Sequence, residues 1–153
     1  MSVEPGSVIA DFTAESTSGP VSLSSLRGRK LVIYFYPKDN TPGCTSEAGD
    51  FRDLHAQFDQ AGVTVLGVSR DSLRSHQNFR SKLELPFHLI TDPEESLCNA
   101  FGVMKMKNMY GKQVRGIERS TFLIDASGKL ARAWRGVKVP GHAQEVLDAA
   151  RSA

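Results

Sequence analysis

The chain has few of the features that mark secreted, membrane-bound or nucleic-acid-binding proteins. Its 153 residues include only two cysteines, too few for the disulfide framework of a small secreted domain. No apolar run approaches the roughly 20 residues needed to cross a bilayer, and residues 1–6 lack the basic and apolar regions of a signal peptide. Because the formal net charge is only +2, we expect no nucleic acid and no anionic membrane as a partner. These absences predict a cytoplasmic protein with free thiols.

Motifs for several other chemistries are also absent. There is no Cys-x-x-Cys motif for dithiol exchange and no glycine-rich phosphate loop. The four histidines are not spaced as metal ligands with the cysteines, so we expect no metal and no cofactor. A Cys–His hydrolase stays open as an alternative, although no feature pairs a particular histidine with a cysteine.

Apolar runs and helical patterns alternate along the chain. Strands are predicted at 31–36, 63–69, 87–90, 121–125 and 130–135. Helices are predicted at 46–60, about 72–83, 92–101 and 142–151. Residues 104–110, with three methionines, are expected to form a loop or an adaptable apolar rim. This order predicts a single α/β domain over 1–153 with a thioredoxin-like fold, in which helices flank a central mixed β-sheet and an N-terminal hairpin or extension precedes it.

One cysteine stands where the first predicted strand gives way to a helix. The segment Pro37–Thr45 reads PKDNTPGCT, which places Cys44 at the first turn of that helix. There a sulfur faces unpaired backbone N–H groups and the positive end of the helix dipole, and both favour the reactive thiolate. Most free cysteines are small buried hydrophobes, but the polar, turn-forming setting of this one favours a reactive thiol.

Four other residues are candidates to assist Cys44, and each also has an ordinary structural interpretation. The Thr41 hydroxyl can donate to a thiolate or substrate oxygen, or cap the helix. Gly43 lets a ligand approach the backbone closely, and Pro37 either shields the pocket or ends the strand. Arg119 precedes a predicted strand, where it is either a solvated surface residue or a cation that reaches Cys44.

The segment Tyr36–Thr45 resembles the peroxiredoxin signature Pro-x-x-x-Thr-x-x-Cys. Its Thr-Pro-Gly-Cys-Thr version is similar to the Q-type branch, also called bacterioferritin comigratory protein. Further matches follow in family order from Gly6 to Asp125 and cover nearly the whole chain. The resemblance implies a thioredoxin-like fold and the reduction of hydrogen peroxide and organic hydroperoxides by a cysteine, without metal or haem.

The resemblance also implies roles for individual residues. Cys44 would be the peroxidatic nucleophile, which attacks the terminal peroxide oxygen and becomes a sulfenic acid. Thr41 and Arg119 would bind and polarise the peroxide, and Pro37 would wall the pocket. Glu47 matches a family position near the site, and like Gly43 it is a candidate for substrate binding.

The chain departs from the family at the resolving cysteine. Many Q-type members carry it five residues after the peroxidatic one, where this chain has Gly49, and others carry it on the next helix, where this chain has none. Only Cys98 remains, either as a buried structural thiol or as an atypical resolving residue, and a disulfide needs Cα atoms within about 7 Å. The main hypothesis is a one-cysteine mechanism in which glutathione, glutaredoxin or thioredoxin resolves the sulfenic acid.

Two further hypotheses belong to other classes. A redox-responsive interaction protein would use a long-lived sulfenic acid as a signal, and a non-catalytic scaffold would retain the motif as a relic. Because Q-type members are often monomers and no long exposed apolar stripe is visible, we favour a monomer over a dimer.

Overall fold

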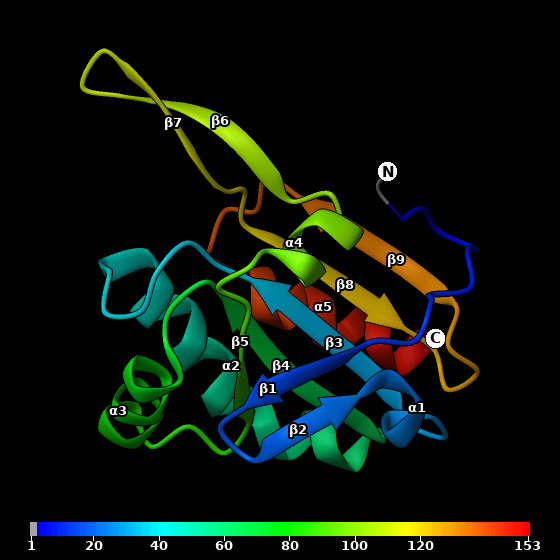
Figure 1. The fold of residues 1–153 in the computed structure, drawn as a ribbon. Coiled ribbons are helices and arrows are strands. Elements are labelled where there is room, and N and C mark those ends of the chain that lie inside the picture. Colours follow the sequence, from blue (N-terminus) through cyan, green and yellow to red (C-terminus); the bar gives the residue numbers. More distant parts are fainter. Residues whose placement is uncertain (1–2) are drawn as a thin grey trace.

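The computed structural model describes residues 3–153, built on a seven-stranded mixed sheet with strand order β2-β1-β5-β4-β3-β8-β9. The strands are β1 (Thr13–Ser16), β2 (Gly19–Ser22), β3 (Lys30–Phe35), β4 (Val63–Ser69), β5 (His88–Thr91), β8 (Ser120–Ile124) and β9 (Leu130–Arg135). The helices are α1 (Leu23–Leu26), α2 (Pro42–Gln60), α3 (Leu73–Leu83), α4 (Ser96–Ala100) and α5 (His142–Ser152). This is the predicted thioredoxin-like α/β architecture, with the predicted hairpin, β1 and β2, near the N-terminus (Figure 1).

The centre of the sheet is β3, which pairs in parallel with β4 and antiparallel with β8. Every residue from Leu31 to Phe35 is buried, as expected for a strand covered on both faces. Because β8 runs antiparallel to β3, its first residue, Ser120, lies opposite Phe35 at the end of β3. The residue before β8 therefore reaches the same edge of the sheet as the loop that follows β3.

The two faces of the sheet carry separate apolar cores. Alternate side chains of β3 point to opposite faces. Tyr34 packs with residues of α2, α3 and α5, and its ring centroid lies 4.6 Å from that of Phe51. Phe35 packs with residues of α1 and α4 on the other face. Figure 1 shows α4 in front of the sheet and α2 and α5 behind it.

α2 begins four residues earlier than the predicted start at 46. Pro42 is its first residue and Thr41 its N-cap. Proline fits that position because the first N–H groups of a helix have no intrahelical partner, so the Pro-Gly pair that resembles a turn is part of the helix. The predicted position of Cys44 in the first turn is confirmed.

α4 begins later than predicted, at Ser96 rather than at residue 92. The intervening turn ends at Glu95, whose φ of 65° is left-handed and interrupts helical geometry. The Asp92 carboxylate still satisfies the start of the helix, accepting hydrogen bonds from the backbone N–H groups of Leu97 (3.2 Å) and Cys98 (2.8 Å).

Of the two interpretations of residues 104–110, the loop is wrong, and the adaptable apolar rim stays a prediction. β6 (Met104–Met109) and β7 (Lys112–Ile117) form a separate two-stranded ribbon, which projects from the body of the protein in Figure 1. Its turn places Tyr110 and Gly111 at φ values of 54° and 80°, as in a type I′ hairpin. The side chain of Met109 lies outside what the structure describes.

Candidate active site

The candidate active site lies at the carboxyl end of β3, in the first turn of α2. Residues 36–41 connect these two elements, and residues 37–41 of this connection are here called the site loop. The side chain of Cys44 is buried, with 1% of the residue exposed, and belongs to the core formed with α2, α3 and α5. A thiol held there is shielded from bulk solvent, and the site loop leads directly into the helical turn that carries it.

Arg119 reaches Cys44, as the sequence suggested it could. Its Nη2 lies 3.4 Å from Cys44 Sγ, within hydrogen-bonding range for sulfur. The contact follows from topology, since Arg119 directly precedes β8 and β8 starts beside the end of β3. A guanidinium beside the sulfur offers donors both to the sulfur and to an oxygen that approaches it.

Glu47, one turn further along α2, holds the other arm of the guanidinium. Arg119 Nη1 donates to Glu47 Oε1 at 2.6 Å, and only 1% of Glu47 is exposed. Burial raises the pKa of Glu47 to about 7, against the opposing effect of Arg119. Its second oxygen, Oε2, has no hydrogen-bond partner among residues 3–153. Glu47 therefore orients Arg119, and its charge depends on pH near neutrality.

Gly43 leaves room for the guanidinium. A Cβ atom built on Gly43 would lie 3.1 Å from Arg119 Nη2, closer than most real Cβ contacts. Any larger residue at this position would displace the arm of Arg119 that contacts the sulfur.

Thr41 is the N-cap of α2, but its side chain does not cap the helix. Its hydroxyl donates instead to the carbonyl oxygen of Lys38, at 2.8 Å, which closes the site loop on itself. The alternative interpretation of Thr41, a side chain that caps the helix, is therefore wrong, and its contact with peroxide stays a prediction. Pro37 is partly exposed at the start of the same loop.

Cys98 lies on the other face of the sheet from Cys44. It is fully buried in the core shared with α4, and both cysteines are free thiols. Burial, followed by the neighbouring Asp92, raises the pKa of the Cys98 thiol well above its usual range. These surroundings disfavour the reactive thiolate, while the role of Cys98, as a structural thiol or a resolving residue, stays a prediction.

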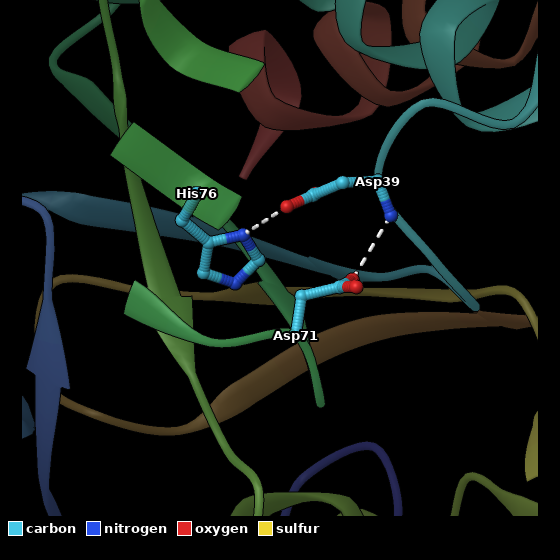
Figure 2. Close-up of side chains that lie close together, drawn as sticks. All are labelled: Asp39, Asp71 and His76. Atoms are coloured by element: carbon cyan, nitrogen blue, oxygen red, sulfur yellow. Dashed lines mark hydrogen bonds and ion pairs between the residues drawn. The ribbon is translucent and has the colours of Figure 1, made fainter. Parts of the chain in front are cut away.

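One group of side chains in residues 3–153 could offer metal ligands: Asp39, Asp71 and His76, whose ligand atoms all lie within 4.8 Å of one another (Figure 2). However, Asp39 Oδ2 and His76 Nδ1 are only 2.7 Å apart. That is a hydrogen-bond distance. Two ligand atoms that each lie about 2.0–2.2 Å from a shared metal ion would be further apart than this. The group is a polar network, which the spacing of its residues in the sequence does not indicate.

The fold and the buried thiol beside an arginine define a class of enzyme, and comparison with known proteins identifies it. Residues 5–133 match the AhpC/TSA family, and the chain belongs to that family of thiol-dependent peroxidases. None of its helices in residues 3–153 is long and apolar enough to cross a membrane.

Within that family the similarity is to peroxiredoxins of the Bcp, or Q, type. The chain is 53% identical to peroxiredoxin Bcp of Xanthomonas campestris pv. campestris, covering 94% of this chain and 95% of that protein. It is 49% identical to a putative peroxiredoxin bcp of Coxiella burnetii, covering 96% and 98%. A solved structure of Xylella fastidiosa PrxQ, in a cysteine-to-serine mutant, superposes with a TM-score of 0.94 at 44% identity, covering 99% of this chain and 98% of that chain. The predicted family and fold are thus confirmed.

Proposed function

We propose that Cys44 is the peroxidatic nucleophile. Its thiolate attacks the terminal oxygen of a peroxide, ROOH; the O–O bond breaks, a sulfenic acid forms on Cys44, and the leaving RO⁻ takes up a proton to become ROH. The observation that carries this proposal is the 3.4 Å contact between Arg119 Nη2 and Cys44 Sγ in the first turn of α2. Among residues 3–153, the other cysteine, Cys98, receives no such hydrogen bond from an arginine or lysine side chain.

We assign Arg119, Gly43, Thr41 and Pro37 to peroxide binding. Arg119 can donate to the peroxide oxygens as negative charge develops on the leaving group, while Gly43 keeps the guanidinium within reach of the sulfur. Thr41 and Pro37 lie at the two ends of the site loop, which leads into the helical turn that carries Cys44. Glu47 acts through Arg119 and is a positioning residue.

We further propose that the sulfenic acid is resolved by an external thiol. That thiol condenses with the sulfenic acid, releasing water and leaving a mixed disulfide, and a second thiol then regenerates Cys44. The arrangement of the two cores supports this scheme, because the alternative partner, Cys98, is buried across the sheet. A Cys44–Cys98 disulfide would require one sulfur to leave its core.

A relative with a solved structure indicates a class of peroxide substrate. A solved structure at 51% identity concerns the alkyl peroxide reduction activity of Xanthomonas campestris bacterioferritin comigratory protein, and we propose alkyl hydroperoxides together with hydrogen peroxide as substrates here. Thioredoxin, glutaredoxin and glutathione are the candidate reductants. We propose that residues 1–153 act as one cytoplasmic domain and as a monomer; the sheet, which takes strands from both halves of the chain, supports the single domain.

Steady-state turnover of two serine variants tests the mechanism. With hydrogen peroxide and a thiol reductant, we expect Cys44→Ser to abolish turnover and Cys98→Ser to retain it. Loss of turnover in Cys98→Ser, with the first oxidation of Cys44 intact, would establish the two-cysteine alternative. Oxidation of Cys44 without turnover by any of the three reductants would favour a redox-responsive interaction protein.

A further inference from the structure

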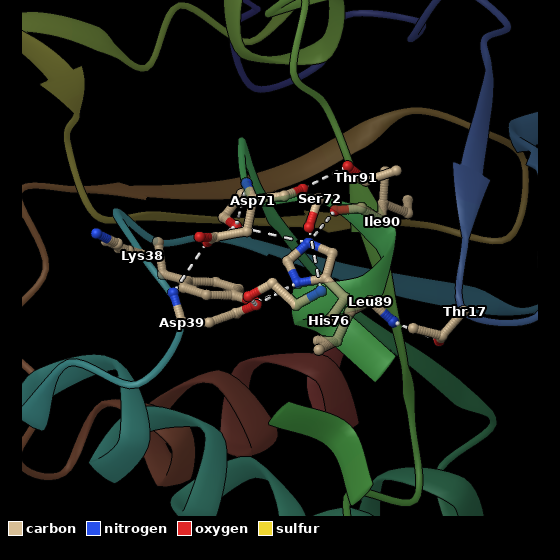
Figure 3. Close-up of polar contacts among 12 residues, drawn as sticks. Thr17, Lys38, Asp39, Asp71, Ser72, His76, Leu89, Ile90 and Thr91 are labelled. Atoms are coloured by element: carbon tan, nitrogen blue, oxygen red, sulfur yellow. Dashed lines mark hydrogen bonds and ion pairs between the residues drawn. The ribbon is translucent and has the colours of Figure 1, made fainter. Parts of the chain in front are cut away.

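A buried polar network fastens the site loop to the rest of the fold. Asp39, in the middle of that loop, accepts hydrogen bonds from Tyr36 Oη (2.6 Å) and Ser75 Oγ (2.8 Å). Its Oδ2 also lies 2.7 Å from His76 Nδ1, and its backbone N–H donates to Asp71 Oδ2 at 2.9 Å. We call these five residues the loop anchor; Figure 3 shows its contacts around Asp39, Asp71 and His76.

The hydrogen bonds of His76 require a proton shared with Asp39. His76 Nε2 lies 3.0 Å from the carbonyl oxygen of Ile90, which can only accept, so Nε2 must donate. On the other side Nδ1 faces the Asp39 carboxylate, and the two groups hold one proton between them. Neither side chain is more than a few per cent exposed. A buried pair of this kind binds strongly while both partners are present and is costly to break.

The anchor joins elements that are far apart in sequence. Ser75 and His76 belong to the first part of α3, Ile90 to β5, and Asp71 follows β4, where Ser69 Oγ donates to its carboxylate at 2.5 Å. Asp39 therefore connects the site loop to three elements of the scaffold. The loop otherwise has one internal side-chain bond, from Thr41 to the carbonyl oxygen of Lys38.

The anchored conformation suits the reaction of Cys44 with peroxide better than the later reaction of oxidised Cys44 with a thiol reductant. A peroxide is small, and its reaction needs Arg119 and the first turn of α2, into which the site loop leads, held in place at a buried sulfur. A thiol reductant is larger, and it must reach the sulfur of Cys44, of which only 1% is exposed. The loop and the first turn of α2 must therefore move outward before the reductant can react.

We propose that Asp39 and His76 are positioning residues that set the balance between these two conformations. An intact anchor favours reaction of Cys44 with peroxide and restrains its reaction with bulky thiols and disulfides. Weakening the anchor slows the first reaction and accelerates the second. This inference rests on the proposed role of Cys44 and goes beyond it by assigning the control of access to a separate group of residues.

Opposite changes in two rates test the proposal. The first rate is the oxidation of reduced Cys44 by hydrogen peroxide, followed by quenching and mass measurement. The second is the reaction of reduced Cys44 with the bulky aromatic disulfide dithiobis(nitrobenzoate), in which the thiolate forms a mixed disulfide and releases a coloured thiol. Peptide mapping assigns the modified cysteine.

Asp39→Ala removes the three side-chain contacts of Asp39, and Ser75→Ala removes only one, so the second variant remains informative if the first fails to fold. For Asp39→Ala we expect the peroxide rate to fall and the aromatic-disulfide rate to rise, each by roughly tenfold or more, given the usual strength of hydrogen bonds to charged groups. Asp39→Asn, which keeps the shape and part of the bonding, restores both rates in part.

Asp92→Ala is the matched control. Asp92 is also a buried carboxylate that accepts two backbone hydrogen bonds, but it lies at α4. We expect it to lower stability without moving the two rates in opposite directions. The proposal is overturned if Asp39→Ala moves both rates in the same direction or neither, or if Asp92→Ala gives the same opposite changes. Failure of the wild-type Cys44 to react with peroxide would instead refute the proposed function.

Discussion

Replacing Arg119 with alanine is the perturbation from which the structure predicts the largest effect apart from loss of Cys44 itself. The substitution removes the donor 3.4 Å from Cys44 Sγ and the partner 2.6 Å from Glu47 Oε1. Loss of one donor that stabilises developing negative charge typically lowers the rate of the chemical step by about 10²–10³-fold, or roughly 2.7–4 kcal/mol. We expect a decrease of that order in the second-order rate constant for Cys44 oxidation by hydrogen peroxide.

Rapid mixing with peroxide, acid quenching and intact-mass analysis measure this rate constant directly and do not depend on a reductant. Arg119→Lys retains the charge but not the two-armed contact with the sulfur and Glu47, so its rate should fall between those of wild type and Arg119→Ala. Arg132→Ala serves as a control, because Arg132 is an exposed arginine paired with Glu145 and should leave the rate unchanged. A rate for Arg119→Ala within about threefold of wild type, far above the expected range, would refute the reasoning.

Three other substitutions probe the surroundings of the site. Burial raises the pKa of Glu47 to about 7, from the ordinary 4.5. The folded state therefore binds the proton of the Glu47 carboxyl group more tightly than the unfolded state does, and the protein loses stability as pH rises from 4.5 through 7. Between pH 5 and pH 8, the free energy of unfolding measured with urea should fall by up to about 3 kcal/mol more in wild type than in Glu47→Gln. Equal changes in the two proteins would contradict this prediction. Burial lowers the pKa of His142 to about 4, from 6.5, so its contribution to stability is complete above pH 6.5 and is lost as pH falls towards 4. His142→Gln should flatten this acid limb of the stability profile measured by urea unfolding, and an unchanged limb would count against it. Gly43→Ala should slow the oxidation of Cys44 by peroxide several-fold, because the added Cβ atom displaces the guanidinium of Arg119. Thermal unfolding should show no loss of stability, because alanine is favoured over glycine in a helix by up to about 1 kcal/mol. An unchanged oxidation rate would show that the close approach of Gly43 does not hold the guanidinium in place.

The central sheet and the position of Cys44 at the start of α2 are predictable from the sequence because they depend on local signals. The continuous apolar runs at 31–36 and 63–69 identified the buried parallel strands, and the Pro-Gly-Cys segment after the first of them placed Cys44 at a helix start. Residue spacing alone favours a solvated surface position for Arg119, and only the resemblance to peroxiredoxins supports a site role. Its contact with Cys44 depends on the antiparallel pairing of β3 with β8, which residue spacing alone does not specify.

The features that the sequence did not predict depend on long-range or unusual backbone geometry. α4 starts late because Glu95 adopts a left-handed conformation that proline and acidic residues at 92–95 do not suggest. The β6–β7 ribbon turns at Tyr110–Gly111, without the Asn-Gly or Asp-Gly pair that usually marks such a hairpin. The loop anchor joins Asp39 to His76, 37 positions apart. One signal for the loop anchor is present in the sequence: His76 lies on the same face of its predicted helix as Phe79. That face is apolar, so a histidine buried there requires a polar partner.

The central claim, a one-cysteine peroxidase acting through Cys44, is tested most directly by the intact mass of the reduced protein after one equivalent of hydrogen peroxide. We expect a gain of about 16 Da, or about 32 Da on overoxidation, located on Cys44 by peptide mapping. A loss of about 2 Da in a monomer would instead mean that Cys44 and Cys98 had formed a disulfide, and it would contradict the assignment of Cys98 as a structural thiol.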